Sequence, residues 1–146
     1  MAKAMDIAIT AWAPLAGGAL TGKYLIENKK AKRLSPESDR LNKRNTKITK
    51  EVVRIAQEIG CTPAQVAIKW TMQRRQVVIP IVGASSATQM KDNLKSTDIE
   101  LSEKQLLRLN RLSAVKLGFP HDFLASPYVR ALITAATSEM IDNHWQ

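Results

Sequence analysis

The chain has little of what would cross-link it or anchor it in a membrane. Its 146 residues include one cysteine, Cys61, so an intramolecular disulfide is excluded. Because this residue follows Gly60 at the start of a helical pattern, we interpret it as a packed thiol rather than a nucleophile. The apolar runs are far shorter than a membrane span, and the N-terminus lacks the apolar stretch of a signal peptide. We therefore expect a cytoplasmic protein.

Acidic residues are scarce beside basic ones, since 13 Asp and Glu face 22 Lys and Arg for a net charge of +9. Such a charge attracts polyanions. However, no aromatic residue lies between Leu25 and Ile48 to stack on bases, and no nucleic-acid-binding module is recognisable. We interpret the basic stretch as a solvated loop and expect no nucleic-acid partner. Its basic residues are Lys29, Lys30, Lys32, Arg33, Arg40, Lys43, Arg44, Lys47 and Lys50.

Two widely separated segments share one pattern, a short apolar run that leads into a turn of small residues. Residues 5–12 read as a buried strand ended by Pro14, and residues 76–82 as a strand covered on both faces. A strand, a glycine-bearing turn and a helix N-terminus together form a common site for phosphate groups.

Helical patterns fill most of the remaining sequence. We predict a helix over residues 48–59 with Gly60 as its C-cap. Capping boxes begin at Thr62, Ser86 and Ser102. The helices that they open bury Val66, Ala67, Trp70 and Met72 in the first, end near Leu94 in the second, and in the third end near Ser113 and bury Leu106, Leu107, Leu109 and Leu112.

The remaining segments are predicted as follows: a helical turn over 20–26, a long loop over 27–47, irregular structure from 115 to 127 and a final helix over 128–141. A strand, a helical connection and a second strand form a βαβ unit with parallel strands.

The two loops carry a family resemblance. Trp12-Ala-Pro-Leu-Ala-Gly-Gly-Ala-Leu-Thr-Gly-Lys23 resembles the loop after the seventh barrel strand of the aldo-keto reductases, which use NADPH. Gly83-Ala-Ser-Ser86, followed by Gln89 and Asn93, resembles the loop and helix after the last strand. A TIM barrel takes about 250 residues. The resemblance therefore implies an α/β, helix-rich C-terminal fragment of a TIM barrel, with two parallel strands and a single domain over residues 1–146.

The resemblance also implies the cofactor-binding residues. In the family the first loop lies along the cofactor pyrophosphate, the second holds the adenosine 2′-phosphate, and the Gln and Asn side chains hold the adenine. The residues that match the first loop are Trp12, Ala13, Pro14, Leu15, Ala16, Gly18, Leu20 and Lys23. Those that match the second are Gly83, Ala84, Ser85, Ser86, Gln89 and Asn93. Helix capping by Ser86 and Gln89, and a plain tight turn in the first loop, are the alternative interpretations.

Two positions depart from the family pattern. Ala13 replaces a common serine, so one hydroxyl contact is lost, and Ser85 replaces a basic residue that pairs with the 2′-phosphate. Each charge-assisted hydrogen bond is worth roughly 1.5–3 kcal/mol. We therefore expect a weaker preference for NADP over NAD, unless Lys91 or a lysine of the basic loop substitutes.

Residues 117–124 resemble a C-terminal stretch near the family's substrate mouth. There Phe119 and Phe123 either shape a pocket or pack on helices, and His121 beside Asp122 is not expected to form a general base. The family's catalytic Asp, Tyr, Lys and His come from barrel strands that have no counterpart here. The tyrosines, Tyr24 and Tyr128, are not in the required strand-end context. We assign no catalytic or metal-binding residue.

These observations predict the cofactor-binding C-terminal part of an NADP-dependent reductase, with weak NADP affinity and no activity alone. Two strands cannot close a barrel. The chain is therefore expected to form homo-oligomers, to repack, or to dock onto a complementing chain, and we expect a split or truncated reading frame, or a fragment. The alternative is a non-enzymatic, self-associating module. The sequence does not predict the substrate.

Overall fold

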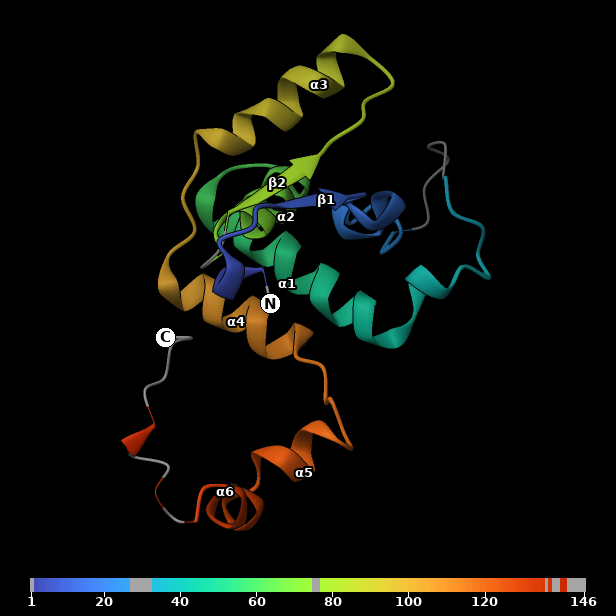
Figure 1. Ribbon diagram of the computed structural model, residues 1–146. Coiled ribbons are helices and arrows are strands. Elements are labelled where there is room, and N and C mark those ends of the chain that lie inside the picture. The colour runs from blue at the N-terminus through green and yellow to red at the C-terminus, as the bar shows by residue number, and fades with distance from the viewer. Residues whose placement is uncertain (1, 27–32, 75–76, 136, 138–139, 142–146) are drawn as a thin grey trace. The chain divides into compact units, whose positions relative to one another are not determined.

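The computed structural model describes residues 2–26, 33–74, 77–135, 137 and 140–141. The chain forms two compact units, Met1–Ser113 and Ala114–Gln146. The prediction of a single domain over residues 1–146 remains a prediction. The first unit is a helix-rich α/β structure with two strands among its described residues (Figure 1).

The two strands are parallel neighbours, as predicted from the sequence. β1 (Ile9–Trp12) pairs with β2 (Val78–Ile81) in a register that places Ile9 opposite Val78 and Trp12 opposite Ile81. Both are four residues long and therefore shorter than predicted.

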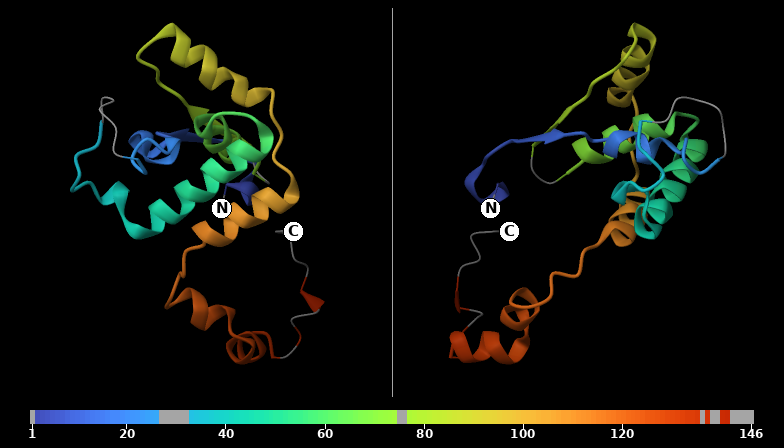
Figure 2. Two further views of the ribbon diagram at one scale, coloured as in Figure 1. Left: turned by 180° about the vertical axis from the view of Figure 1, so that it is seen from behind. Right: turned by 90° about the vertical axis from the view of Figure 1, so that its right-hand side faces the viewer.

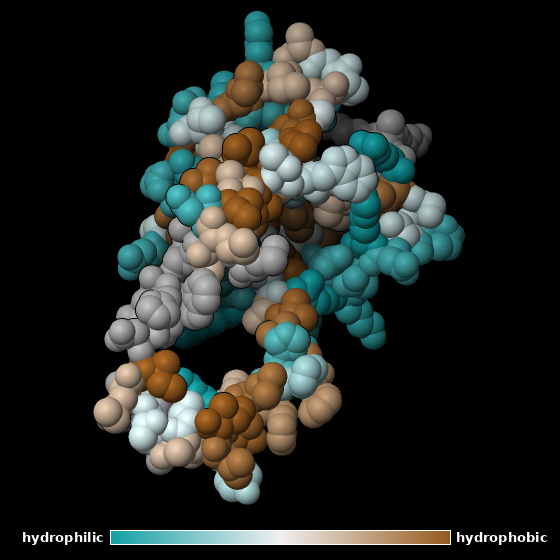
Figure 3. Space-filling view, in the orientation of Figure 1, coloured by the Kyte–Doolittle hydropathy of each residue, from teal (hydrophilic) through white to brown (hydrophobic). Residues whose placement is uncertain are grey.

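The expected covering of both sheet faces is wrong for the described residues. Along each strand, partly buried and exposed positions alternate, so that one face is covered and the other is not. Trp12 is 76% exposed, and Ile79 and Ile81 are each 52% exposed. Figure 3 shows apolar side chains on this face of the molecule. We call Trp12, Ile79 and Ile81 the open sheet face.

Two capped helices follow one another between the strands. α1 (Lys43–Ile59) begins five residues earlier than predicted, because the Asn42 side chain accepts a hydrogen bond from the Asn45 amide at 2.8 Å and starts the helix there. It ends, as predicted, at Gly60 in the left-handed conformation. α2 (Pro63–Met72) begins at a complete capping box formed by Thr62 and Gln65.

The next two helices follow the second strand. α3 (Ala87–Leu94) and α4 (Glu103–Ser113) have the predicted ends. The buried face of α4 was predicted too wide, since Leu107 is 49% and Leu112 41% exposed, whereas Leu109 is fully buried. α4 packs chiefly against α1 and therefore buries only a narrow stripe of its surface.

The hydrophobic core lies among α1, α2 and α4. Leu106, Leu15 and Leu20 pack on its edge, so the loop after β1 is fastened to the core. Its buried members are Ile48, Val52, Ile55, Ala56, Val66, Ala67, Trp70, Leu101 and Leu109.

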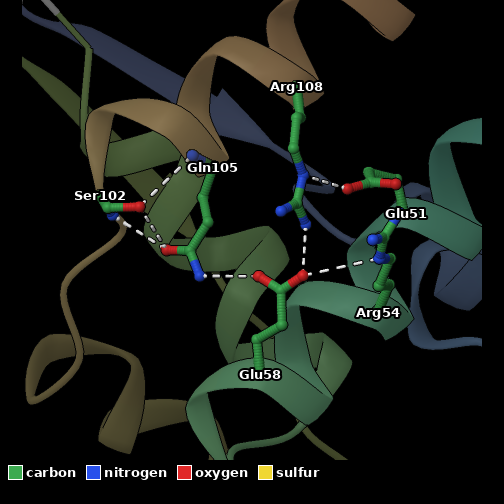
Figure 4. Close-up of polar contacts among 6 residues, drawn as sticks. All are labelled: Glu51, Arg54, Glu58, Ser102, Gln105 and Arg108. Carbon is green, nitrogen blue, oxygen red and sulfur yellow. Dashed lines mark hydrogen bonds and ion pairs between the residues drawn. The ribbon is translucent and has the colours of Figure 1, made fainter.

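A polar cluster joins the outer edges of α1 and α4, which lie side by side in Figures 1 and 2. Figure 4 shows Arg108 of α4 between two carboxylates of α1. Its guanidinium donates to Glu51 at 2.5 Å and to Glu58 at 2.8 Å. Glu58 also accepts from Gln105 at 3.1 Å and pairs with Arg54 at 3.6 Å. These bonds fix the register of the two helices.

This cluster predicts a stability that falls with acid. The hydrogen bonds from Arg108, and then Gln105, hold the pKa of Glu58 below its ordinary value. Because the pKa is lower in the folded chain than in the unfolded chain, the contribution is complete above the ordinary carboxyl pKa and is lost as pH falls through the folded value. The Arg108→Gln variant should therefore lose less unfolding free energy than wild type between neutral and acid pH, measured by urea denaturation.

Arg54→Gln is the matched control, because Arg54 is 69% exposed and lies farther from Glu58. It should keep the wild-type acid dependence. An Arg108→Gln protein with the same acid dependence as wild type would contradict the assigned role of this ion pair.

The second unit contains two short helices among its described residues. α5 (His121–Ala125) lies where irregular structure was predicted, and α6 (Pro127–Ile133) is shorter than the predicted helix over 128–141. Ser126 caps α6 by accepting from the Val129 amide at 3.3 Å. The next residue, Pro127, is the first of the helix, a position that favours proline. The 3-10 helices of the chain are η1 (Lys3–Met5), η2 (Ala16–Thr21), η3 (Asp39–Leu41) and η4 (Lys95–Thr97).

Within the part of the chain that the structure describes, no helix has both the length and the apolar character needed to span a membrane.

Candidate functional site: two loops at one sheet edge

The two loops singled out in the sequence leave the sheet at the same edge. Because β1 and β2 are parallel and paired in register, Ala13 and Val82 follow strand ends that lie side by side. Figure 1 shows both arrowheads directed toward the same side. In α/β proteins, ligands bind at the carboxyl ends of parallel strands. The arrangement therefore places the start of each loop at the usual position of a ligand.

The first loop has an unusually tight backbone. Ala13 and Ala16 have φ angles of 53° and 50°, which non-glycine residues adopt only at a cost. Gly17 and Gly18 continue in the left-handed region with φ angles of 69° and 93°. Strained backbone of this kind is concentrated at ligand sites. The predicted helical turn over 20–26 is instead η2, which begins at Ala16.

Cationic side chains flank the two glycines. A Cβ on Gly17 would lie 2.9 Å from Nη1 of Arg40, and a Cβ on Gly18 would lie 3.0 Å from Nζ of Lys23. A side chain larger than hydrogen would displace these groups. The loop therefore presents two glycines with positive charge next to both.

Other residues of this loop serve the fold. Leu15 and Leu20 are partly buried and pack their side chains on the core. The Thr49 hydroxyl reaches the Ala19 carbonyl at 3.2 Å, which ties the loop to α1. Trp12 is largely exposed beside the loop.

The second loop is open at its glycine and engaged further along. A Cβ on Gly83 would meet no atom within 4 Å. The predicted capping box is only half formed, and this corrects the interpretation: Ser86 accepts from the Gln89 amide at 3.1 Å, but Gln89 Oε1 accepts from Ser85, not Ser86. The Ser85 amide and hydroxyl lie 2.8 and 2.9 Å from that oxygen.

Asn93 stands out among the buried polar groups. Its side chain is 4% exposed, and its Nδ2 is the single buried side-chain nitrogen or oxygen among the described residues that has no hydrogen-bond partner. An unpaired buried amide costs about 1–3 kcal/mol. Such a cost is retained in native proteins where a ligand or water satisfies the group.

Asp92 holds this helix in place. Gln65 Nε2 donates to the Asp92 carbonyl at 2.9 Å and to its carboxylate at 2.8 Å, and the Thr62 hydroxyl donates to the same carboxylate at 3.3 Å. The capping box of α2 is thereby bonded to α3. These bonds set the position of Asn93, the next residue along α3.

Sequence reasoning missed the roles of Asp92 and Arg40. Asp92 has no local sequence signal, because its partners lie 27 and 30 residues away. Arg40 was assigned to a solvated loop; Lys29, Lys30 and Lys32 of that stretch lie outside the described residues. Ser38 followed by Asn42, two capping residue types close together, was a usable signal that this part of the stretch is ordered.

A pocket of about 900 Å³ adjoins the first loop. Its wall includes Ala19 of the loop and three cationic residues, Arg33, Arg40 and Lys50. The described walls thus favour an anionic occupant next to η2.

The cysteine, tyrosine and histidine side chains are further candidates for reactive groups. Burial, with a smaller effect of the nearby Asp92 charge, raises the pKa of the Cys61 thiol, as suits the packed thiol predicted from the sequence. The Tyr24 hydroxyl accepts from the Leu34 amide at 2.9 Å. In the second unit, His121 and Asp122 are exposed on α5, and the Phe119 and Phe123 rings are 5.8 Å apart.

Comparison with known proteins finds the same family that the two loops resemble. The model of the family described as "Aldo/keto reductase family" matches residues 1–114. An "Uncharacterized oxidoreductase YrpG" of Bacillus subtilis is 32% identical over 108 residues, which are 74% of this chain and 32% of that protein. A "Probable aldo-keto reductase 1" of Glycine max is 28% identical over 81% of this chain and 35% of its own length.

Some relatives have other names. A "Putative voltage-gated potassium channel subunit beta" of Schizosaccharomyces pombe is 34% identical over 61% of this chain and 28% of its own length. The chain spans about a third of the length of these curated relatives.

Proposed function

Because this chain belongs to the aldo/keto reductase family, we propose that it is the C-terminal, cofactor-binding part of an NADP-dependent reductase of aldehydes or ketones. It binds the adenosine and diphosphate half of the dinucleotide between its two loops. The relatives named oxidoreductase and aldo-keto reductase support the chemistry, and the one-third coverage of their length supports a part of a barrel rather than a whole one.

One observation carries this proposal. Two loops with separate signals start at the carboxyl ends of paired parallel strands: one holds the glycine pair beside Arg40 and Lys23, and the other is the open Gly83 turn. The second loop leads into α3, which carries Asn93 with its unpaired amide. A dinucleotide carries an anionic diphosphate at one end of its adenosine half and an adenine with hydrogen-bond acceptors at the other. The cationic glycine loop suits the diphosphate, and the unpaired Asn93 amide suits the adenine.

The residue that would bind the 2′-phosphate of NADP is Ser85, which carries no charge. Ser85 offers a hydroxyl where a cation would be stronger, and this hydroxyl already lies 2.9 Å from Gln89 Oε1. Lys91 is exposed on α3 in the following turn and is the proposed substitute. We therefore propose NADP as the cofactor, with NAD bound nearly as well.

The chain alone is proposed to be inactive in hydride transfer. The Tyr24 hydroxyl is bonded to the Leu34 amide, and Tyr128 is 75% exposed on α6 of the other unit. A tyrosine acid needs a lysine and a carboxylate to adjust its pKa. The Lys23 ammonium lies 5.1 Å from the centre of the Tyr24 ring, while the Tyr24 hydroxyl accepts from a backbone amide. The catalytic groups and the substrate pocket would come from the remaining strands.

Titration of the 146-residue chain with NADPH and NADH tests the cofactor proposal. We expect saturable quenching of the tryptophan fluorescence, since Trp12 adjoins the first loop, with similar affinities for the two cofactors. Asn93→Ala should weaken NADPH binding roughly 2- to 10-fold, the worth of one neutral hydrogen bond. Gln57→Ala is the control, because Gln57 is exposed on α1 and belongs to neither loop.

Two results would contradict the proposal. If wild type shows no saturable response to either nucleotide, the two loops resemble those of the family by common descent but do not bind the cofactor. If Asn93→Ala and Gln57→Ala bind equally, the adenine does not contact Asn93.

A second proposal concerns assembly and rests on the open sheet face. Two paired strands leave both sheet edges without a partner among the described residues, beside three large exposed apolar side chains. We propose that the isolated chain covers this face with a second copy of itself.

A further inference from the structure

One face of α1 carries a line of exposed cations. Side chains that are three or four residues apart on a helix lie on the same face, and four of the basic residues of α1 have this spacing. From the first to the last, the line covers about 16 Å along the helix axis. All four are exposed. We call them the basic row: Lys43, Lys47, Lys50 and Arg54.

The acidic residues of α1 do not neutralise the basic row. Figure 4 shows Glu51 and Glu58 directed toward Arg108 of α4, which donates to both carboxylates. Arg54 pairs with Glu58 at 3.6 Å, although its side chain is 69% exposed. The three lysines of the row form no ion pair with any residue that the structure describes. Their charges are therefore available to an anionic partner.

α4 adds further cations beside the row. The two helices lie side by side (Figures 1 and 2). Lys104 and Arg111 are exposed on α4, and they share a face of that helix with Arg108, which contacts α1. The positive surface therefore extends from α1 onto its neighbour.

We infer that the basic row binds the phosphate backbone of double-stranded nucleic acid, without reading its sequence. Basic residues along one helix of a strongly basic chain, here with a net charge of +9, are the electrostatic signature of such a protein. A phosphate backbone is a regular line of negative charge, which a line of cations matches. This inference is separate from the proposed cofactor site and does not rest on it.

Two other anionic partners match the surface less well. Single strands are held by aromatic side chains that stack on the bases, and α1 has no aromatic residue. Stable membrane attachment needs an apolar contact in addition to a basic cluster. The structure describes the whole of α1, and none of its large apolar side chains is exposed.

Binding to a duplex backbone needs neither feature, because phosphate contacts supply essentially all of the affinity of non-specific binding. The sequence-based expectation of no nucleic-acid partner rested on the lack of stacking residues and of a recognition module. Backbone binding uses neither of them, and the alignment of the cations on one face became visible only with the helix.

The salt dependence of duplex binding tests the inference. Fluorescence anisotropy of a short labelled DNA duplex of mixed sequence, titrated with the 146-residue chain at several salt concentrations, gives the slope of log K against log salt. Each phosphate contact contributes about −0.9 to this slope, so the three unpaired lysines predict about −3 or steeper. Lys47→Gln should make the slope shallower by about 1 and weaken duplexes of different sequence equally.

Lys95→Gln is the matched control, because it removes the same charge from an exposed residue of η4, away from the basic row in the sequence. It should leave the slope unchanged. The double variant Lys43→Gln/Lys47→Gln should lose about 2 from the slope. These lysines are exposed, so all variants should keep the wild-type circular dichroism spectrum.

Three outcomes would overturn the inference. A wild-type chain without salt-dependent duplex binding would refute it and leave the proposed function untouched. Equal slopes for Lys47→Gln and Lys95→Gln would mean that binding follows net charge and that the basic row is not the site. Binding to single strands or to phosphatidylserine vesicles, without binding to the duplex, would assign the surface to a different class of partner.

Discussion

Replacing Leu109 with alanine is expected to lower the unfolding free energy by about 2–5 kcal/mol. Leu109 is fully buried in the core among α1, α2 and α4. Its removal leaves a cavity that the surrounding residues can close only in part. Small domains have unfolding free energies of about 5–15 kcal/mol, so this single change removes a large share of the stability. Urea denaturation followed by circular dichroism measures it.

Leu107→Ala is the matched control on the same helix. Because Leu107 is 49% exposed, its truncation should change the unfolding free energy by about 0.5 kcal/mol or less. Equal losses in the two variants would mean that the face of α4 extends as widely as the sequence pattern suggested, and that the core described above is wrong.

Self-association of the isolated chain is the second large expected effect. A buried side chain the size of isoleucine contributes about 1.5–3 kcal/mol relative to an exposed one. Trp12, Ile79 and Ile81 lie on one face and are at least half exposed, so pairing two copies buries six such side chains. Sedimentation velocity should show a dimer or larger species whose share rises with protein concentration.

Ile81→Lys should shift the chain to a monomer, because it places a charge on the open sheet face opposite Trp12. Leu112→Lys is its control, since Leu112 is 41% exposed on α4 instead. A wild-type chain that stays monomeric and folded at every concentration would refute the proposal that a second copy covers this face.

Much of the fold followed from local sequence signals. Gly60 ends α1 and the Thr62–Gln65 box begins α2 as predicted, because caps depend on residues only a few positions apart. The parallel pairing of β1 and β2 followed from their separation by helices. The start of α1 was missed because its cap, Asn42, lies inside a basic stretch without an apolar pattern.

Features that depend on distant neighbours were not predictable. The apolar pattern of α4 includes Leu107 and Leu112, but which leucines are buried depends on how many elements surround the helix. The strand residues read as buried on both faces, yet a face is buried only when something packs on it. In the candidate site, the resemblance supplied the two loops, whereas Arg40 beside Gly17 and Asp92 beside Gln65 arise from contacts across the fold.

The central claim is that the two loops form one dinucleotide site, and amide chemical-shift mapping by NMR tests it most directly. On titration of the chain with NADP⁺, we predict shifts at Gly17 and Gly18 in the first loop and at Gly83, Ser85 and Asn93 beyond the second strand, all saturating at the same concentration. Shifts in one loop without the other, or an unchanged spectrum, would contradict the account.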